Sequence, residues 1–209
     1  TKAFAEGADI HTYTASLVFG VGEKDVTTEM RGMAKTVNFG IVYGMSPYGL
    51  SQSLNIEVDK AKEFIDSYFE RYPGVKIYME GLIAEAREKG FVTTILGRRR
   101  YIPEINSQDM RLRQFAERTA INTPIQGSAA DVIKVAMLRI HEKLSSGKLG
   151  TKMIMQVHDE LVFDVPKDEL DEAVSIVRRG MENVIKLKVP IVAHIESGVN
   201  WLEMEEIKD

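Results

Sequence analysis

The sequence predicts an α+β fold, in which a helical first half precedes a second half of helices and antiparallel strands. Two observations lead to this prediction. The stretches between residues 27 and 90 look helical and end at glycine or proline. Beyond residue 90, short runs rich in valine, isoleucine and methionine are bounded by turn residues, as strands are. A chain of 209 residues can hold one sizeable core or two small subdomains, and a boundary is expected near residues 106–108.

Three helices are expected in the first half. The first runs from about residue 28 to Tyr43 and ends at Gly44, because glycine favours the left-handed conformation that closes a helix. The other two cover residues 60–71 and about 75–89, and they end at Pro73 and Gly90.

The middle of the chain predicts a hairpin and a long helix. Residues 91–96 have a strand pattern and are followed by Gly97 and the Arg98–Arg100 run, which predicts a hairpin with a basic turn. Residues 110–144 are expected to be mostly helical, with an interruption near Pro124 and Gly127.

His158-Asp159-Glu160 lies between two apolar runs, residues 152–157 and 161–165, and is expected at the tip of a second hairpin. A hairpin tip holds carboxylates in water on a rigid support, which suits the presentation of a hard divalent cation to a polyphosphate. The plainer interpretation is an acidic turn without chemistry. A helix from about residue 167 to 184 and a last strand at residues 191–196 are expected to follow.

Composition excludes several classes of protein. The chain has no cysteine, which rules out disulfides, thiolate metal sites and cysteine nucleophiles and fits a reducing compartment. It has no apolar run of about 18 residues, so no membrane partner is expected. It opens without methionine or a signal pattern, so we expect a fragment or a processed piece.

Charge is distributed unevenly along the chain. The net charge is −4, yet residues 87–118 contain eight Lys or Arg against four acidic residues, and residues 201–209 are acidic. The net value argues against a wholly basic nucleic-acid binder, but local sign decides which partner a surface fits.

Arg31, Lys35, Phe39 and Tyr43 are spaced by four residues on the first predicted helix. Each step of four drifts by only about 40° on an α-helix, so the four side chains form one slowly turning stripe. The order of two cations and two aromatic rings matches a nucleoside triphosphate, with phosphates met by the cations and sugar and base met by the rings. The alternative is a helix with two exposed cations and an aromatic core edge.

These motifs together resemble the family A DNA polymerases, the bacterial DNA polymerase I group. The stripe is similar to that family's second motif, and Gln156-Val157-His158-Asp159-Glu160 is similar to its third. Residues 97–100 and 118–131 also match the family pattern in order and spacing, and the likeness covers essentially all 209 residues.

The resemblance implies a role for each stripe residue. Arg31 and Lys35 would bind the triphosphate, and Lys35 would also protonate the leaving pyrophosphate. Phe39 would pack on the sugar and base, and Tyr43 would hold the pocket of the templating base. His11, within Asp9-Ile10-His11-Thr12, would lie near the β-phosphate.

The resemblance also implies metal and DNA contacts. Asp159 would be a metal-binding carboxylate, Glu160 an auxiliary one, and His158 would touch the primer terminus. The remaining expected DNA contacts are Arg98 and three residues spaced by four on one helix face, Arg118, Asn122 and Gln126. Without the resemblance, that face would be an ordinary polar helix surface.

The implied enzyme is a bacterial, cytoplasmic DNA-directed DNA polymerase. It would use two Mg²⁺ ions to join deoxynucleoside triphosphates to the primer of a primer-template. Residues 1–107 would form the fingers subdomain, with the nucleotide-binding helix at about residues 28–43. Residues 108–209 would form the C-terminal part of the palm, with the catalytic hairpin at residues 152–165.

The family's first motif, an Asp-Tyr-Ser segment that carries a second metal-binding Asp, is not in this sequence. We therefore expect a missing N-terminal polymerase portion and an inactive isolated chain. Two other functions compete with this one. A non-catalytic, DNA-binding relic of a polymerase would not need Asp159, and an unrelated metal-dependent phosphoesterase would not explain the stripe from Arg31 to Tyr43.

Overall fold

The computed structural model of the chain describes residue 4 and residues 7–207. The chain packs as two compact units that divide between Ser128 and Ala129, inside a long helix. We call residues up to 128 the N-terminal unit and residues from 129 the C-terminal unit. Each has its own core, so each is described by itself.

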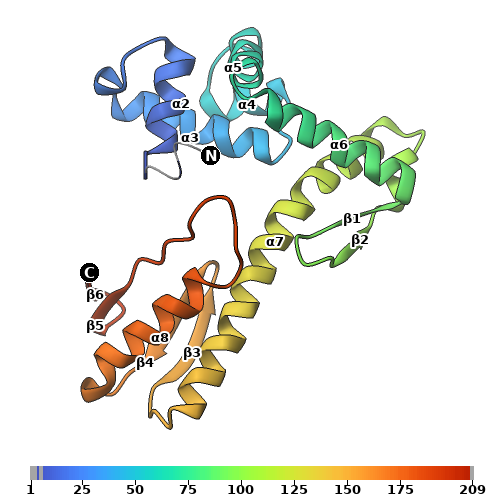
Figure 1. Cartoon of the computed structure of the whole chain (residues 1–209). Coiled ribbons are helices and arrows are strands. Elements are labelled where there is room, and N and C mark those ends of the chain that lie inside the picture. Colours follow the sequence, from blue (N-terminus) through green and yellow to red (C-terminus); the bar gives the residue numbers. More distant parts are fainter. Residues whose placement is uncertain (1–3, 5–6, 208–209) are drawn as a thin grey trace. The chain divides into compact units, whose positions relative to one another are not determined.

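Helices dominate the N-terminal unit (Figure 1). They pack around a core formed by Val37, Ile41, Leu50, Phe64 and Tyr68, with Ala61 between them. The elements described between residues 7 and 89 are α2 (Ile10–Phe19), η1 (Glu23–Asp25), α3 (Thr28–Val42), α4 (Pro47–Leu54), α5 (Val58–Arg71) and α6 (Pro73–Lys89).

Helix α3 begins and ends where local signals place it, as predicted. The Thr27 side chain accepts a hydrogen bond from the backbone N–H of Met30 at 3.2 Å and so caps the N-terminus. Gly44 follows with φ of 67°, the left-handed conformation that glycine adopts without strain. The helices predicted at residues 60–71 and 75–89 are confirmed as α5 and α6.

Helix α4 was not predicted. Ser46 caps it by accepting a hydrogen bond from the N–H of Gly49, and Pro47 occupies its first turn. Proline is favoured at that position because its missing N–H has no helical partner there. Pro47 therefore begins a helix, and Pro73 likewise begins α6.

The basic hairpin exists, but its strands are shorter than predicted. Strand β1 (Phe91–Thr93) pairs antiparallel with β2 (Arg99–Tyr101), and Val92 lies opposite Arg100. The N–H of Thr94 donates to the carbonyl of Arg98, which closes the turn between them. Of the three arginines, only Arg98 lies in the turn, so the prediction that the whole run forms the turn is wrong. A 3-10 turn, η2 (Pro103–Asn106), follows.

Helix α7 (Met110–Ser146) continues through Pro124, so the predicted interruption is wrong. Proline removes one helical hydrogen bond and crowds the preceding turn, but packing on both sides of it holds the helix. Before Pro124, Ala116 and Ala120 are buried in the same core as Val92. After it, Ile140 and its neighbours lie in the core of the C-terminal unit.

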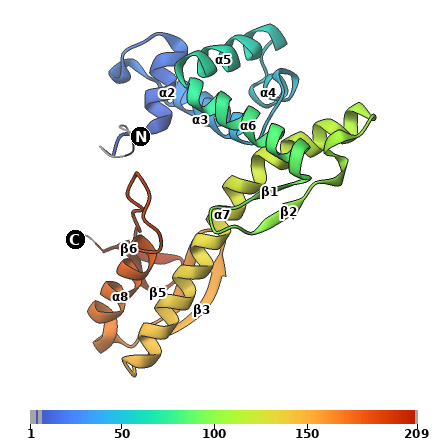
Figure 2. The same cartoon turned by 45° about the vertical axis from the view of Figure 1, so that its right-hand side comes forward.

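The C-terminal unit places α7 after residue 128 beside a hairpin and helix α8 (Figure 2). Close approach of the two helices depends on Gly180, where a Cβ atom would lie 2.4 Å from Cγ1 of Ile140. The elements are β3 (Lys152–Val157), β4 (Glu160–Asp164), η3 (Lys167–Glu169), α8 (Leu170–Glu182), β5 (Glu196–Asn200) and β6 (Glu203–Glu206).

The last strand was predicted too early in the chain. Residues 191–195 are not a strand, because Ala193 bonds to side chains of α8: its N–H donates to Glu182 at 3.1 Å, and its carbonyl accepts from Arg178 at 3.3 Å. The strand is β5, which pairs antiparallel with β6. No apolar alternation marks β5, because Val199 is the one apolar side chain between Glu196 and Asn200.

The α+β prediction is confirmed, since every paired strand in the described residues is antiparallel and helices form the larger part. No helix within residues 7–207 is long and apolar enough to span a bilayer.

Candidate active site

The stripe predicted from the sequence lies on one exposed face of α3. Arg31, Lys35 and Phe39 are exposed along the helix, while Ala34, Val37 and Ile41 on the opposite face are buried. Tyr43 caps the C-terminal end. The rings of Phe39 and Tyr43 stack with centroids 6.3 Å apart and planes 17° apart. Both rings are over two-fifths exposed, so an aromatic ligand can reach their faces.

His11 in α2 joins this face from outside the helix. Its ring centroid lies 5.7 Å from that of Phe39, and its Nδ1 lies 3.0 Å from Nδ2 of Asn38. Burial lowers the pKa of His11 below its ordinary value, Asp9 opposes this shift, and the positive charges of Arg31 and Lys35 add to it. The face therefore combines two basic side chains, two aromatic rings and an imidazole.

The end of α3 rests on the part of α7 that belongs to the same unit. The side-chain amide of Asn122 donates to the carbonyl of Tyr43 at 3.4 Å. A Cβ atom at Gly44 would lie 3.2 Å from Cγ of Arg118, so the turn needs glycine both for its backbone angle and for this approach. Two of the predicted DNA-contacting residues thus also support the α3 face.

A groove of about 330 Å³ follows this stretch of α7. Asn122 and Gln126, which the family resemblance implied as DNA contacts, line the groove together with residues that were not predicted as site residues. The full lining is Arg100, Thr119, Asn122, Thr123, Gln126 and Gly127. Arg100 contributes because β2, not the turn, carries it. The groove is polar and carries positive charge, which suits a nucleic-acid backbone.

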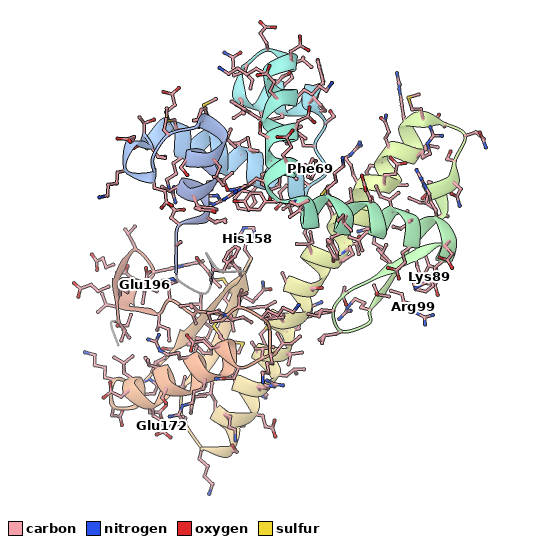
Figure 3. All side chains as sticks on the ribbon, turned by 45° about the horizontal axis from the view of Figure 1, so that its top comes forward. Phe69, Lys89, Arg99, His158, Glu172 and Glu196 are labelled. Carbon is pink, nitrogen blue, oxygen red and sulfur yellow. The ribbon has the colours of Figure 1, made fainter. Side chains whose placement is uncertain are left out.

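The basic hairpin is anchored to α7 at the rim of this groove. The N–H of Ile95 donates to the Ser128 hydroxyl at 2.8 Å, and that hydroxyl donates to the carbonyl of Pro124. Gly127 permits the approach, because a Cβ atom there would lie 2.7 Å from Cγ2 of Thr94. Figure 3 labels Arg99 on β2, whose guanidinium lies 4.8 Å from the ring centroid of Phe91. These contacts fix the hairpin that carries Arg98.

The carboxylate hairpin of the C-terminal unit has a two-residue turn. Val157 pairs with Glu160, which leaves His158 and Asp159 at the tip (Figure 3 labels His158). His158 has φ of 52°, and its carbonyl accepts a hydrogen bond from the Gln156 side chain at 2.5 Å. All three polar residues of the predicted triplet are exposed. The predicted three-residue tip is therefore wrong by one residue, since Glu160 begins β4.

Carboxylate oxygens are the donors that Mg²⁺ prefers, so Asp159 and Glu160 suit that ion chemically. They are nevertheless only two donors. No group of three or more histidine, aspartate or glutamate residues able to hold a metal occurs in the part of the chain that is described. The donor set here fits Mg²⁺ as part of a site and needs at least one further ligand to complete it.

Comparison with known proteins gives a consistent family. The model of DNA polymerase family A matches residues 1–203. DNA polymerase I of Streptococcus pneumoniae serotype 4 is 54% identical over 203 residues, which are 97% of this chain and 23% of that protein. DNA polymerase I of Geobacillus stearothermophilus is 50% identical over 202 residues, with the same two shares, 97% and 23%. The chain thus spans about a quarter of the length of these relatives.

A solved structure has the same fold. It is the POL domain of Pol1 from M. smegmatis in complex with DNA primer-template and dNTP, with a TM-score of 0.87 and 43% sequence identity. The match covers 90% of this chain and 33% of that one.

Proposed function

This chain belongs to DNA polymerase family A. We propose that it binds the incoming nucleotide in a DNA-directed DNA polymerase and that it contributes part of the metal site. The observation that carries the proposal is the exposed face of α3, where Arg31, Lys35, Phe39 and Tyr43 lie in line with His11 beside them. Residues 1–107 would serve as the fingers subdomain and residues 108–209 as the C-terminal part of the palm.

The α3 face binds a deoxynucleoside triphosphate along its length. Residues 31 and 43 are separated by about 18 Å of helix at the usual rise per residue, enough for a base, a sugar and three phosphates. The Arg31 guanidinium contacts phosphate oxygens through its planar fork, and Lys35 contacts them as a compact charge. Phe39 packs on the sugar and base. Tyr43 forms part of the pocket of the templating base, and His11 lies near the β-phosphate.

Each unit carries residues that would contact primer-template DNA. Asn122 and Gln126 present side-chain amides in the groove beside α7. Such amides can donate hydrogen bonds to minor-groove acceptors without strong sequence preference. Arg98 and Arg118 are exposed and would contact the phosphate backbone. His158, at the tip of the carboxylate hairpin, would touch the primer terminus.

Asp159 and Glu160 would hold Mg²⁺ together with at least one further ligand. When bound, the ion would supply charge neutralisation on the phosphates and activation of the primer 3′-hydroxyl. The chain's own residues do the rest: Arg31 and Lys35 fix the triphosphate for in-line attack on the α-phosphorus. Lys35 then gives a proton to the pyrophosphate oxygen as the bond to the α-phosphorus breaks.

The 209 residues alone are expected to extend no primer. Two neighbouring carboxylates on one hairpin cannot complete a metal site that must bridge the attacking and leaving oxygens. The assay incubates the isolated chain with Mg²⁺, all four deoxynucleotides and a labelled primer-template, beside a full-length polymerase that carries the same residues. Efficient templated extension by the isolated chain would show that these residues complete the site without further ligands.

Phe39→Tyr in the full-length polymerase is expected to raise incorporation of dideoxynucleotides. Phe39 has no hydroxyl, and in the family that the chain resembles a phenylalanine here goes with rejection of 3′-deoxy terminators. A tyrosine hydroxyl can take the place of the missing 3′-hydroxyl as a hydrogen-bonding group. The ratio of kcat/KM for dideoxy and deoxy substrates measures the effect, with Phe69→Tyr on α5 as the control. Unchanged selectivity would mean that Phe39 does not contact the sugar.

A further inference from the structure

An ion pair links the proposed nucleotide-binding face to the start of α2. Nε of Arg31 lies 2.5 Å from Oδ2 of Asp9, 22 residues earlier in the chain. The two side chains are 45% and 41% exposed, a setting in which an isolated ion pair adds little to stability. This ion pair matters for binding rather than for stability, because Arg31 is proposed to bind the triphosphate.

Asp9 is itself held in place. It is the N-cap of α2, and its Oδ1 accepts the backbone N–H of His11 at 3.0 Å. Its Oδ2 accepts the hydroxyl of Thr12 at 2.8 Å in addition to Arg31. Helix α2 packs closely on α3, and each helix carries a fully buried alanine, Ala15 in α2 and Ala34 in α3. These contacts hold the Asp9 carboxylate in place, and its ion pair in turn restricts the Arg31 side chain.

The contact uses the inner donor of the guanidinium and leaves the outer ones. Among the hydrogen bonds of the described residues, none involves Nη1 or Nη2 of Arg31. Those atoms form the planar fork that matches two oxygens of a phosphate. An arginine without such an ion pair loses much side-chain conformational entropy when it binds an anion. The ion pair with Asp9 already restricts Arg31, so binding costs it less entropy.

We infer that Asp9 is a positioning residue, which holds the fork of Arg31 ready for the triphosphate of the incoming nucleotide. The inference rests on the proposed function of the α3 face. A carboxylate near phosphates also repels them, but three donors already surround this one: Arg31, the Thr12 hydroxyl and the His11 amide. The same hydrogen bonds, that of Arg31 first, hold the pKa of Asp9 well below its usual range. Positioning therefore outweighs repulsion.

The test is a set of variants in the full-length polymerase. Asp9→Ser keeps a side chain that can cap α2 but is too short to reach Arg31. We expect it to raise KM for the deoxynucleotide about 3- to 10-fold, because binding then carries the cost of ordering one long side chain. The kcat is expected to stay within about a factor of two. Asp9→Asn, which keeps an oxygen for Nε, should give an intermediate KM.

A double-mutant cycle separates action through Arg31 from a general effect on α2. In an Arg31→Ala background, Asp9→Ser should raise KM no further. Asp66→Ser, which removes an exposed carboxylate from α5, is the control and should leave KM unchanged. An Asp9→Ser variant with unchanged or lower KM would overturn the inference, as would an equal rise in both backgrounds.

The single variant Arg31→Ala distinguishes failure of this inference from failure of the proposed function. If it raises KM while Asp9→Ser does not, only the role of Asp9 is overturned. If it leaves KM unchanged, Arg31 does not bind the nucleotide, and both the proposed function of the α3 face and the role of Asp9 are overturned.

Discussion

Replacing Asp159 with asparagine in a full-length polymerase that carries this chain is expected to slow primer extension on the order of 10³-fold, or about 4 kcal/mol in activation free energy. Asparagine has nearly the same size but lacks the negative charge that a hard divalent cation needs. Asp159 lies in an exposed two-residue turn whose shape comes from the backbone of β3 and β4. The change should therefore leave folding and DNA binding intact.

The matched control for Asp159 is at the other end of the same hairpin. Asp164 is exposed and pairs with Lys152 in the ladder, so Asp164→Asn removes an equal charge from the same element, away from the tip. It should leave extension within a factor of about two, as surface substitutions usually do. Single-turnover extension measures both variants, and the proposed role of Asp159 would be contradicted if the two lost activity equally.

Replacing Lys35 with alanine is expected to lower kcat/KM for the deoxynucleotide about 10- to 100-fold. The loss corresponds to about 1.5–3 kcal/mol, the usual worth of a hydrogen bond to a charged group. Lys35 is exposed on the same face as Arg31, so no core contact is lost with it. Alanine is also the best helix former, so α3 itself is not weakened.

Lys35→Arg separates the two roles proposed for this residue. Arginine keeps the positive charge for phosphate binding but does not give up its proton under physiological conditions. We expect a KM near that of the unaltered enzyme with a reduced kcat. Lys62→Ala, on an exposed position of α5, is the control for loss of a lysine. A Lys35→Arg enzyme with unaltered kcat would rule out proton donation by Lys35.

Elements with strong local signals could be predicted from the sequence. Helix α3 is an example, because the residues that end it, Thr27 at the N-terminus and Gly44 at the C-terminus, lie next to it in the sequence. The continuity of α7 through Pro124 could not be predicted, because it depends on cores that lie on either side of the proline. The shift of the last strand has the same origin, as side chains from α8 bind the backbone of Ala193.

The candidate site divides in the same way. The stripe from Arg31 to Tyr43 follows from helical period alone, so spacing was sufficient to find it. Asp9 and Arg100 required the structure. The contact of Asp9 with Arg31 joins the start of α2 to α3, and Arg100 lies in β2 and lines the groove beside α7. Residues that act through another residue leave no periodic signal of their own.

The most direct measurement is single-nucleotide incorporation by the full-length polymerase that carries this chain, on four primer-templates that differ only in the templating base. With Mg²⁺ present, each template should accept mainly its complementary deoxynucleotide, and Asp159→Asn should slow incorporation about 10³-fold on all four. Incorporation that ignores the template would contradict the proposed function. DNA binding without any incorporation, unaffected by Mg²⁺ or nucleotide, would instead identify these residues as a DNA-binding relic.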